Sequence, residues 1–111
     1  MYGLLVDGQR KAPLEIAATA RARGKGLLGR SGLTGALWLK QCRHVHTMRM
    51  KFTIEIAHID KTGMVIAVET LRPNRFARFH LRTRSVLEAE AGAFESWGLR
   101  PGIVVDRVHE D

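Results

Sequence analysis

The sequence has little cysteine and no long apolar run. Its single cysteine, Cys42, has no partner for a disulfide within the chain, and a lone thiol fits a reducing compartment. No apolar run approaches the ~20 residues that a membrane-spanning helix needs. The first seven residues lack the basic region that opens a secretory signal. We therefore expect a cytoplasmic protein with no membrane segment.

Acidic residues are also scarce. Eleven Asp and Glu stand against 18 Lys and Arg, which gives the 111-residue chain a formal net charge of +7. The hydrophobic share of 45% and the charged share of 26% are those of a globular domain, which excludes a disordered, collagen-like or fibrous chain. The length predicts one domain over residues 1–111. So short a chain buries a limited core, and any site on it should be shallow.

Part of the positive charge is concentrated in residues 72–84, which hold no acidic residue. This segment interleaves basic and aromatic residues: Arg72, Arg75, Phe76, Arg78, Phe79, His80, Arg82 and Arg84. Arginines that follow phosphates and rings that stack on bases are typical of nonspecific nucleic-acid binding. A solvated, arginine-rich loop explains the same pattern. No helix-turn-helix, zinc-finger or RNA-binding signature accompanies it.

The clearest local element is a β-hairpin. Residues 53–60 and 64–71 are rich in β-branched and apolar side chains, and a turn over 61–63 joins them. Five more strands are expected over 2–6, 14–18, 36–39, 85–90 and 103–105, and two short helices over 20–23, capped by Thr19, and 93–97, stopped by Gly98. Pro13 restricts the strand beside it to a sheet edge or a strand start.

Strands and helices do not alternate regularly along the chain, which argues against a parallel α/β fold. The prediction is an α+β, mainly antiparallel β architecture. In detail it is a small, partly closed β-barrel-like domain of about seven short strands with two short helices.

One segment carries a pattern of metal-binding side chains. From residue 42 to residue 50 the even positions are Cys42, His44, His46, Met48 and Met50. Alternate side chains of an extended chain point to one side, and thiolate, imidazole and thioether ligands suit Cu(I). A bend is needed for them to converge, since alternate residues of a straight strand lie ~6.6 Å apart. The structural alternative is that methionines fill gaps in the core and histidines satisfy backbone groups.

Glu55 is the other candidate, because it lies between Ile54 and Ile56 in the predicted hairpin. Desolvation there would raise its pKa, whereas an arginine or lysine partner would lower it. Carboxylates perturbed in this way occur at functional sites and in buried ion pairs. The chain shows no phosphate loop, paired-carboxylate motif or signature of an activated nucleophile.

Several blocks together resemble a known family. They are Gly26-Leu27-Leu28-Gly29-Arg30, Cys42-x-x-Val45-His46-Thr47-x-x-Met50-x-Phe52-x-Ile54-Glu55, Ile59-Asp60-x-x-Gly63-x-Val65, Val86-Leu87-Glu88-x-x-Ala91-Gly92 and Gly98-Leu99-x-x-Gly102. Their order over residues 14–105 is similar to that of the bacterial and archaeal family called domain of unknown function 192. The resemblance implies a small, mainly β fold with two short helices, and no established activity.

Matched position by position, the resemblance places His46, Thr47, Met50 and Glu55 in the most recognisable segment, and Arg30 and Gly92 in flanking blocks. This chain departs from the family at four positions. The family usually has Asp at Glu55, Pro at Thr53, an aromatic residue at His58 and often Asp at Ile103. Of the five alternating ligands, the resemblance retains Cys42, His46 and Met50.

We expect a non-enzymatic binding or accessory module without a resident cofactor. Its shallow polar pocket near His46 and Glu55, completed by Thr47, Met50 and Arg30, would receive a small polar ligand or a partner's peptide. This hypothesis depends on a bend after residue 42 that brings the imidazole and the carboxylate together.

Three other functions remain open. One is a hydrolase-like or transfer enzyme that uses Glu55 or His46 as a general base. Another is copper binding through Cys42, His46 and Met50. The last is nonspecific nucleic-acid binding through the arginine-rich segment.

Overall fold

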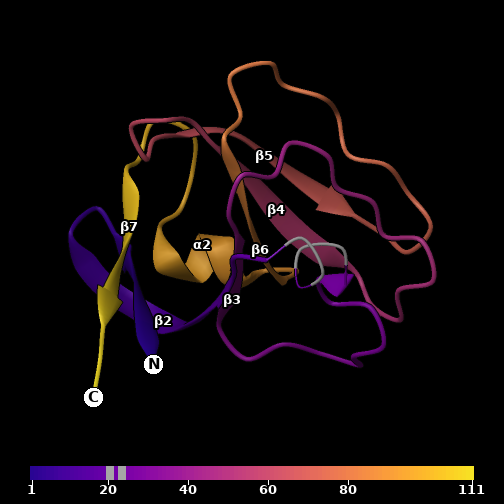
Figure 1. The fold of residues 1–111 in the computed structure, drawn as a ribbon, viewed down its shortest axis with the longest axis horizontal. Coiled ribbons are helices and arrows are strands. Elements are labelled where there is room, and N and C mark those ends of the chain that lie inside the picture. The colour runs from indigo at the N-terminus through magenta and orange to yellow at the C-terminus, as the bar shows by residue number, and fades with distance from the viewer. Residues whose placement is uncertain (20–21, 23–24) are drawn as a thin grey trace.

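The computed structural model describes residues 1–19, 22 and 25–111. Within these residues the chain forms one seven-stranded sheet of order β5-β4-β6-β3-β2-β1-β7 and one short helix, α2 (Figure 1). The elements are β1 Tyr2–Val6, β2 Gln9–Ala17, β3 Ala36–Leu39, β4 Ile54–Ile59, β5 Val65–Leu71, β6 Ser85–Glu90, α2 Ala93–Trp97 and β7 Val105–His109.

The predicted mainly antiparallel β architecture is confirmed. Only β2 and β3 pair in parallel, and the other five pairings are antiparallel. The predicted hairpin over 53–71 is β4 with β5, and Gly63 takes the left-handed conformation in its turn (φ 90°). The last strand was predicted over 103–105, which is wrong. It begins at Val105 and runs to His109, because it pairs with β1 along that length.

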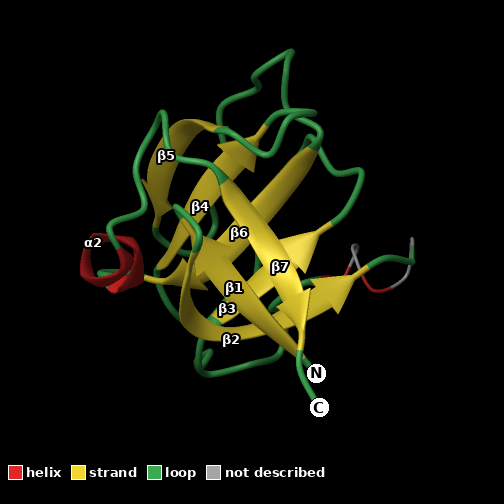
Figure 2. Cartoon of the chain, turned by 90° about the vertical axis from the view of Figure 1, so that its left-hand side faces the viewer, coloured by secondary structure: helices red, strands yellow, loops and turns green. Residues whose placement is uncertain are grey.

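The sheet does not close into a barrel, so the predicted partial closure is not confirmed. At their first residues the edge strands β5 and β7 meet beside an isolated bridge between Met64 and Val104, and the Val105 N–H donates to the Gly63 carbonyl (2.9 Å). The Val65 N–H also donates to the Ile103 carbonyl (2.9 Å) beside this bridge. Figure 2 shows the result, a strongly curved sheet with α2 at one side and the two termini close together.

Of the two predicted helices, the one over 93–97 is confirmed as α2, and it ends at Gly98 in the left-handed conformation (φ 69°). The helix predicted over 20–23 lies outside the described residues except for Ala22. The Ala22 N–H donates to Thr19 Oγ1 (3.0 Å), the bond expected of an N-cap threonine.

The central strands β4 and β6 are covered on both faces. On one face Ala57 and Leu87 belong to a core with Phe94 of α2. On the other face Ile56 and Val86 belong to a second core, whose buried members are Ala17, Leu27, Leu33, Leu37, Leu39, Val45, Met50, Ile54, Ile56, Leu71 and Val86. Polar side chains along these strands are therefore removed from water to different degrees: His58 and Glu88 are buried, and Glu55 is half-buried.

Pro13 does not confine β2 to a sheet edge, because β2 lies between β1 and β3. The pairing of β2 with β3 starts only at Leu14, opposite Ala36. The backbone N–H that Pro13 lacks is therefore not needed for that pairing. Gly35 lies against the Pro13 backbone, and a Cβ at Gly35 would overlap the Pro13 carbonyl oxygen. The parallel start of β3 thus requires glycine at this position.

We expect Gly35→Ala to destabilise the fold far more than Gly8→Ala. Both glycines have φ 80°, but nothing lies within 4 Å of a Cβ at Gly8. The conformation alone costs about 1 kcal/mol, whereas Gly35→Ala must also displace β2 from β3 and should cost at least about 2 kcal/mol more. Urea unfolding measures both, and equal losses would show that the contact with Pro13 is unimportant.

Candidate functional site

Two loops lie side by side and build the site. Residues 42–50 precede β4, and residues 72–84 join β5 to β6 (right and upper part of Figure 1). Backbone bonds connect them: Thr47 N–H to the Arg75 carbonyl (2.8 Å) and Ala77 N–H to the Val45 carbonyl (2.9 Å), with an isolated bridge at His46. The bend that the sequence required in 42–50 is fixed by this pairing.

Thr47 is fully buried between the two loops. Its hydroxyl donates to the Arg72 carbonyl (2.6 Å) and accepts from the Arg75 N–H (2.9 Å). These bonds satisfy backbone groups that would otherwise lack partners. Thr47 therefore holds the loops together, although it was predicted to bind ligand.

The far end of the 72–84 loop is anchored by His58 of β4. This side chain is fully buried, and its Nδ1 lies 3.1 Å from the Thr83 hydroxyl oxygen. Its ring packs on that of His80, with centroids 4.5 Å apart. Burial lowers the pKa of His58, and the charge of His80 lowers it further. His58 thus packs as a neutral ring.

The five alternating side chains of 42–50 line one cavity of about 120 Å³. We call it the Glu88 pocket, after the carboxylate from β6 that also lines it. Its members are Lys25, Gly26, Leu27, Leu28, Leu39, Cys42, His44, Val45, His46, Met48, Met50 and Glu88. Met50, predicted to form an apolar wall, is buried in the core on this face of the sheet, while His46 is exposed at the rim.

Glu88 is the buried carboxyl group of this pocket, and it was not among the residues predicted from the sequence. It is only 4% exposed, and its Oε1 has no hydrogen-bond partner among the described residues. Burial raises its pKa from 4.5 to about 7, against an opposing effect of the Arg30 charge. The Glu88 Oε1 in the pocket wall thus has room to accept a hydrogen bond.

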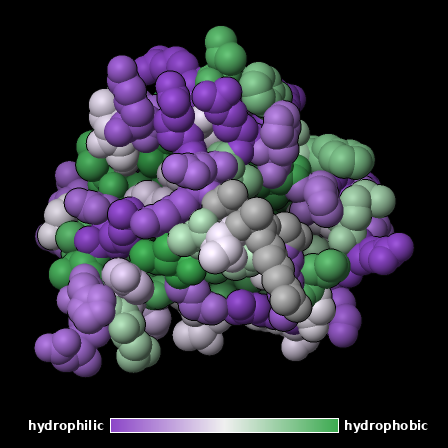
Figure 3. Space-filling view, in the orientation of Figure 1, coloured by the Kyte–Doolittle hydropathy of each residue, from purple (hydrophilic) through white to green (hydrophobic). Residues whose placement is uncertain are grey.

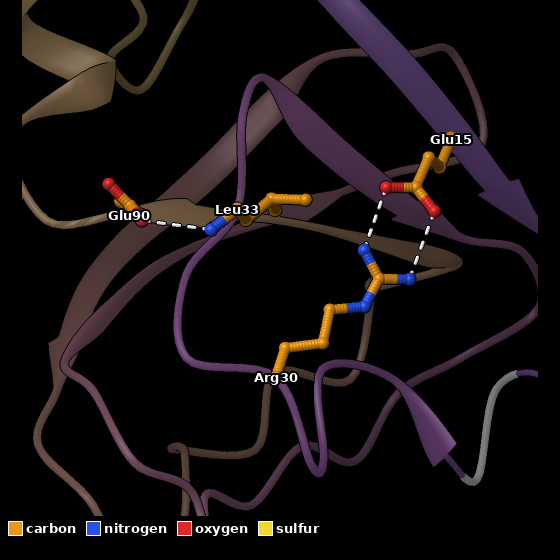
Figure 4. Close-up of polar contacts among 4 residues, drawn as sticks. All are labelled: Glu15, Arg30, Leu33 and Glu90. Atoms are coloured by element: carbon orange, nitrogen blue, oxygen red, sulfur yellow. Dashed lines mark hydrogen bonds and ion pairs between the residues drawn. The ribbon is translucent and has the colours of Figure 1, made fainter.

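Arg30 does not satisfy Glu88, because its guanidinium is paired with Glu15. Two bonds join them, Nη1 to Oε2 at 2.8 Å and Nη2 to Oε1 at 2.9 Å (Figure 4). The bonds lower the pKa of Glu15 and raise that of Arg30. Close by, the Glu90 carboxylate accepts from the Leu33 N–H (2.8 Å). Arg30, predicted to bind ligand, thus fastens its loop to β2.

Glu55 does not share the pocket with His46, so the predicted pairing of these two groups is wrong. On β4, Ile54 and Ile56 face the core beside the pocket, and the alternate positions face the core that contains Phe94. The Glu55 Oε1 accepts from the Phe94 N–H at the start of α2 (3.0 Å). Glu55 thus caps α2 on the opposite face of the sheet.

The copper site predicted from Cys42, His46 and Met50 stays a prediction. All three residues line the pocket, but the Cys42 thiol donates to the His44 carbonyl (3.3 Å) and His46 Nδ1 accepts from the Met48 N–H (3.3 Å). Among the described residues, no group of three or more His, Cys, Asp or Glu is arranged to hold a metal ion.

Within the part of the chain that the structure describes, no helix has the length and apolar character that crossing a membrane requires.

Comparisons with known proteins support the fold. A crystal structure of a protein of unknown function from Novosphingobium aromaticivorans DSM 12444 superposes with a TM-score of 0.80 at 19% identity, over 94% of this chain and 83% of that one. A protein from Sinorhizobium meliloti 1021, described as a "putative transcription regulator", gives 0.78 at 17% identity, over 96% and 94%. No curated protein matches the chain.

The model of the DUF192 family, described as an uncharacterised ACR, matches residues 4–107. This span holds β2 to β6, α2 and the pocket in full, and all of β1 and β7 except the first two residues of β1 and the last two of β7. The chain therefore belongs to the DUF192 family.

Proposed function

We propose that the protein is a binding module whose Glu88 pocket takes a small, neutral ligand that donates N–H hydrogen bonds, such as an amino-heterocycle or a primary amide. The observation that carries this proposal is the buried Glu88 Oε1, which lies in a cavity wall and has no partner among the described residues. A buried acceptor left unpaired costs about 1–3 kcal/mol, and a ligand N–H would remove that cost.

The walls and the rim define the ligand further. Leu27, Leu39 and Val45 are buried apolar wall residues, so they favour a flat or apolar body behind the donor. The exposed Lys25, which lines the pocket, disfavours a free cation. A cavity of about 120 Å³ is close in size to a cavity of about 150 Å³ that binds benzene, which suits a single small ring.

An enzyme that uses His46 and Glu55 together is not supported, because the two side chains lie on opposite faces of the sheet. The proposed binding function requires only the Glu88 pocket. It keeps the predicted binding module and replaces Glu55 with Glu88 as the recognising carboxylate.

Copper(I) is a second candidate occupant, favoured by the five sulfur and nitrogen donors that line the same cavity. Binding would require the Cys42 thiol to lose its proton and leave the His44 carbonyl. Cys42→Ser would then abolish it, whereas the same change should leave the binding of an amino-heterocycle intact.

The first test reads ligand binding at the four methionine methyl groups by ¹³C NMR. Met48 and Met50 line the pocket, and Met1 and Met64 lie outside it. We expect 2-aminopyrimidine to shift the Met48 and Met50 signals saturably and to leave the other two in place. Acetate and methylammonium at the same concentration should give no saturable shift.

Glu88→Leu is the matched variant. It removes the carboxyl group and leaves a side chain of similar size that suits a buried strand. Unchanged Met1 and Met64 signals would show that the variant folds. Loss of the 2-aminopyrimidine response in this variant supports the proposal. An equal response in Glu88→Leu, or no response in the wild type, contradicts it.

The second test is the pH dependence of stability. Because the pKa of Glu88 is about 7 when folded and about 4.3 when unfolded, the folded chain holds this proton more tightly. The Glu88 contribution is thus fully present below about pH 4 and is lost as pH rises to about 8. The loss amounts to about 3 kcal/mol.

Glu88→Gln should remove this loss. Urea unfolding of both proteins from about pH 4 to about pH 8 isolates the Glu88 contribution, because other titrating groups such as His58 affect both alike. We expect the stability difference to shift in favour of Glu88→Gln as pH rises. A difference that stays constant with pH would show that Glu88 is ionised normally in the fold.

A further inference from the structure

The positive charge of the chain is concentrated on one structural feature. Residues 41–54 and 70–84 hold eight basic and no acidic residues, which leaves ten basic against eleven acidic residues in the rest of the sequence. The entire excess of positive charge thus lies in two segments, and the backbone bonds between 42–50 and 72–84 place these side by side. We call the surface that they form the basic platform.

The charges of the platform are largely unneutralised. Its basic residues are all exposed: Arg43, Arg49, Lys51, Arg72, Arg75, Arg78, Arg82 and Arg84. Among the described residues only Arg82 has an ion-pair partner, Asp60 at 3.7 Å. The nearby Glu69 carboxylate is occupied by the Arg78 backbone N–H (3.0 Å). The platform therefore favours a polyanionic partner.

Aromatic rings stand among these charges. Phe76 is 74% exposed and Phe79 is 53% exposed, although large apolar side chains are normally covered. Each contacts a histidine of the other segment: Phe79 stacks on His44 (centroids 5.2 Å apart, planes 17° apart), and Phe76 lies tilted against His46 (6.1 Å, 59°). Over the upper part of Figure 3, hydrophilic and hydrophobic surfaces interleave.

We propose that the basic platform binds single-stranded nucleic acid, with bases stacked on Phe76 and Phe79 and phosphates held by the surrounding arginines. Rings that are exposed and backed by a second ring offer bases a firm stacking surface. Seven of the eight basic residues are arginine, whose planar guanidinium pairs with phosphate through two bonds and also stacks on bases. In a double-stranded nucleic acid the faces of the bases are stacked on one another, so they could not stack on these rings.

The test is fluorescence anisotropy of a labelled oligothymidylate of about 15 nucleotides. Phe76→Leu combined with Phe79→Leu keeps the surface apolar and removes both rings. We expect this double variant to bind at least about fivefold more weakly. Arg78→Gln should reduce the dependence of log affinity on log salt by about 0.7. The charge-matched control Lys11→Gln, on β2 outside the platform, should bind as the wild type does.

Other outcomes overturn the proposal. Equal affinity of the double leucine variant would show that charge alone attracts the oligonucleotide. Equal affinity for a duplex of the same length would show that base stacking is not involved. Phosphatidylserine vesicles that bind the protein and displace the oligonucleotide would identify a membrane surface as the partner. Glu88→Leu should leave oligonucleotide binding unchanged, so failure of the pocket proposal and failure of this one are separable.

Discussion

The constraint on which the rest of the structure depends is the burial of a carboxyl group in a central strand. Glu88 lies on β6 between Leu87 and Ala89, and both faces of that strand are covered by apolar cores. Arg30, whose charge acts on Glu88, is already bound to Glu15. An apolar residue there would favour stability, and the proposed binding function accounts for the carboxyl group that stands in its place.

The paired loops connect this pocket with the surface outside it. Thr47 fixes both loops with one buried hydroxyl, and His58 anchors the far end of the 72–84 loop to β4. As a result the 42–50 segment has two sides with different chemistry. One side lines the cavity around Glu88, and the other carries the exposed Arg43 and Arg49. His46 lines the cavity and also contacts Phe76, so a long ligand on the proposed platform would pass the mouth of the pocket.

Local patterns predicted most of the fold, because hairpins, turns and strand composition are set by neighbouring residues. The β4–β5 hairpin and α2 follow this rule. The site was harder to predict, since it depends on pairing between distant strands. Glu55 and Glu88 both lie on strands with two buried faces. The β4–β6 register pairs Glu55 with Ala89, and this pairing decides which carboxyl group caps α2 and which lines the pocket. The sequence contains the block Val86-Leu87-Glu88, but it does not show on which face of the sheet the Glu88 side chain lies.

The most direct test of this account is the titration of the Glu88 carboxyl carbon by ¹³C NMR, with Glu88→Gln used to assign the signal. The account predicts a pKa of about 7 for the protein alone. It predicts a lower value with 2-aminopyrimidine bound, because N–H donors stabilise the carboxylate. A pKa near the ordinary glutamate value of about 4.3, or a pKa that does not change with the heterocycle, would contradict it.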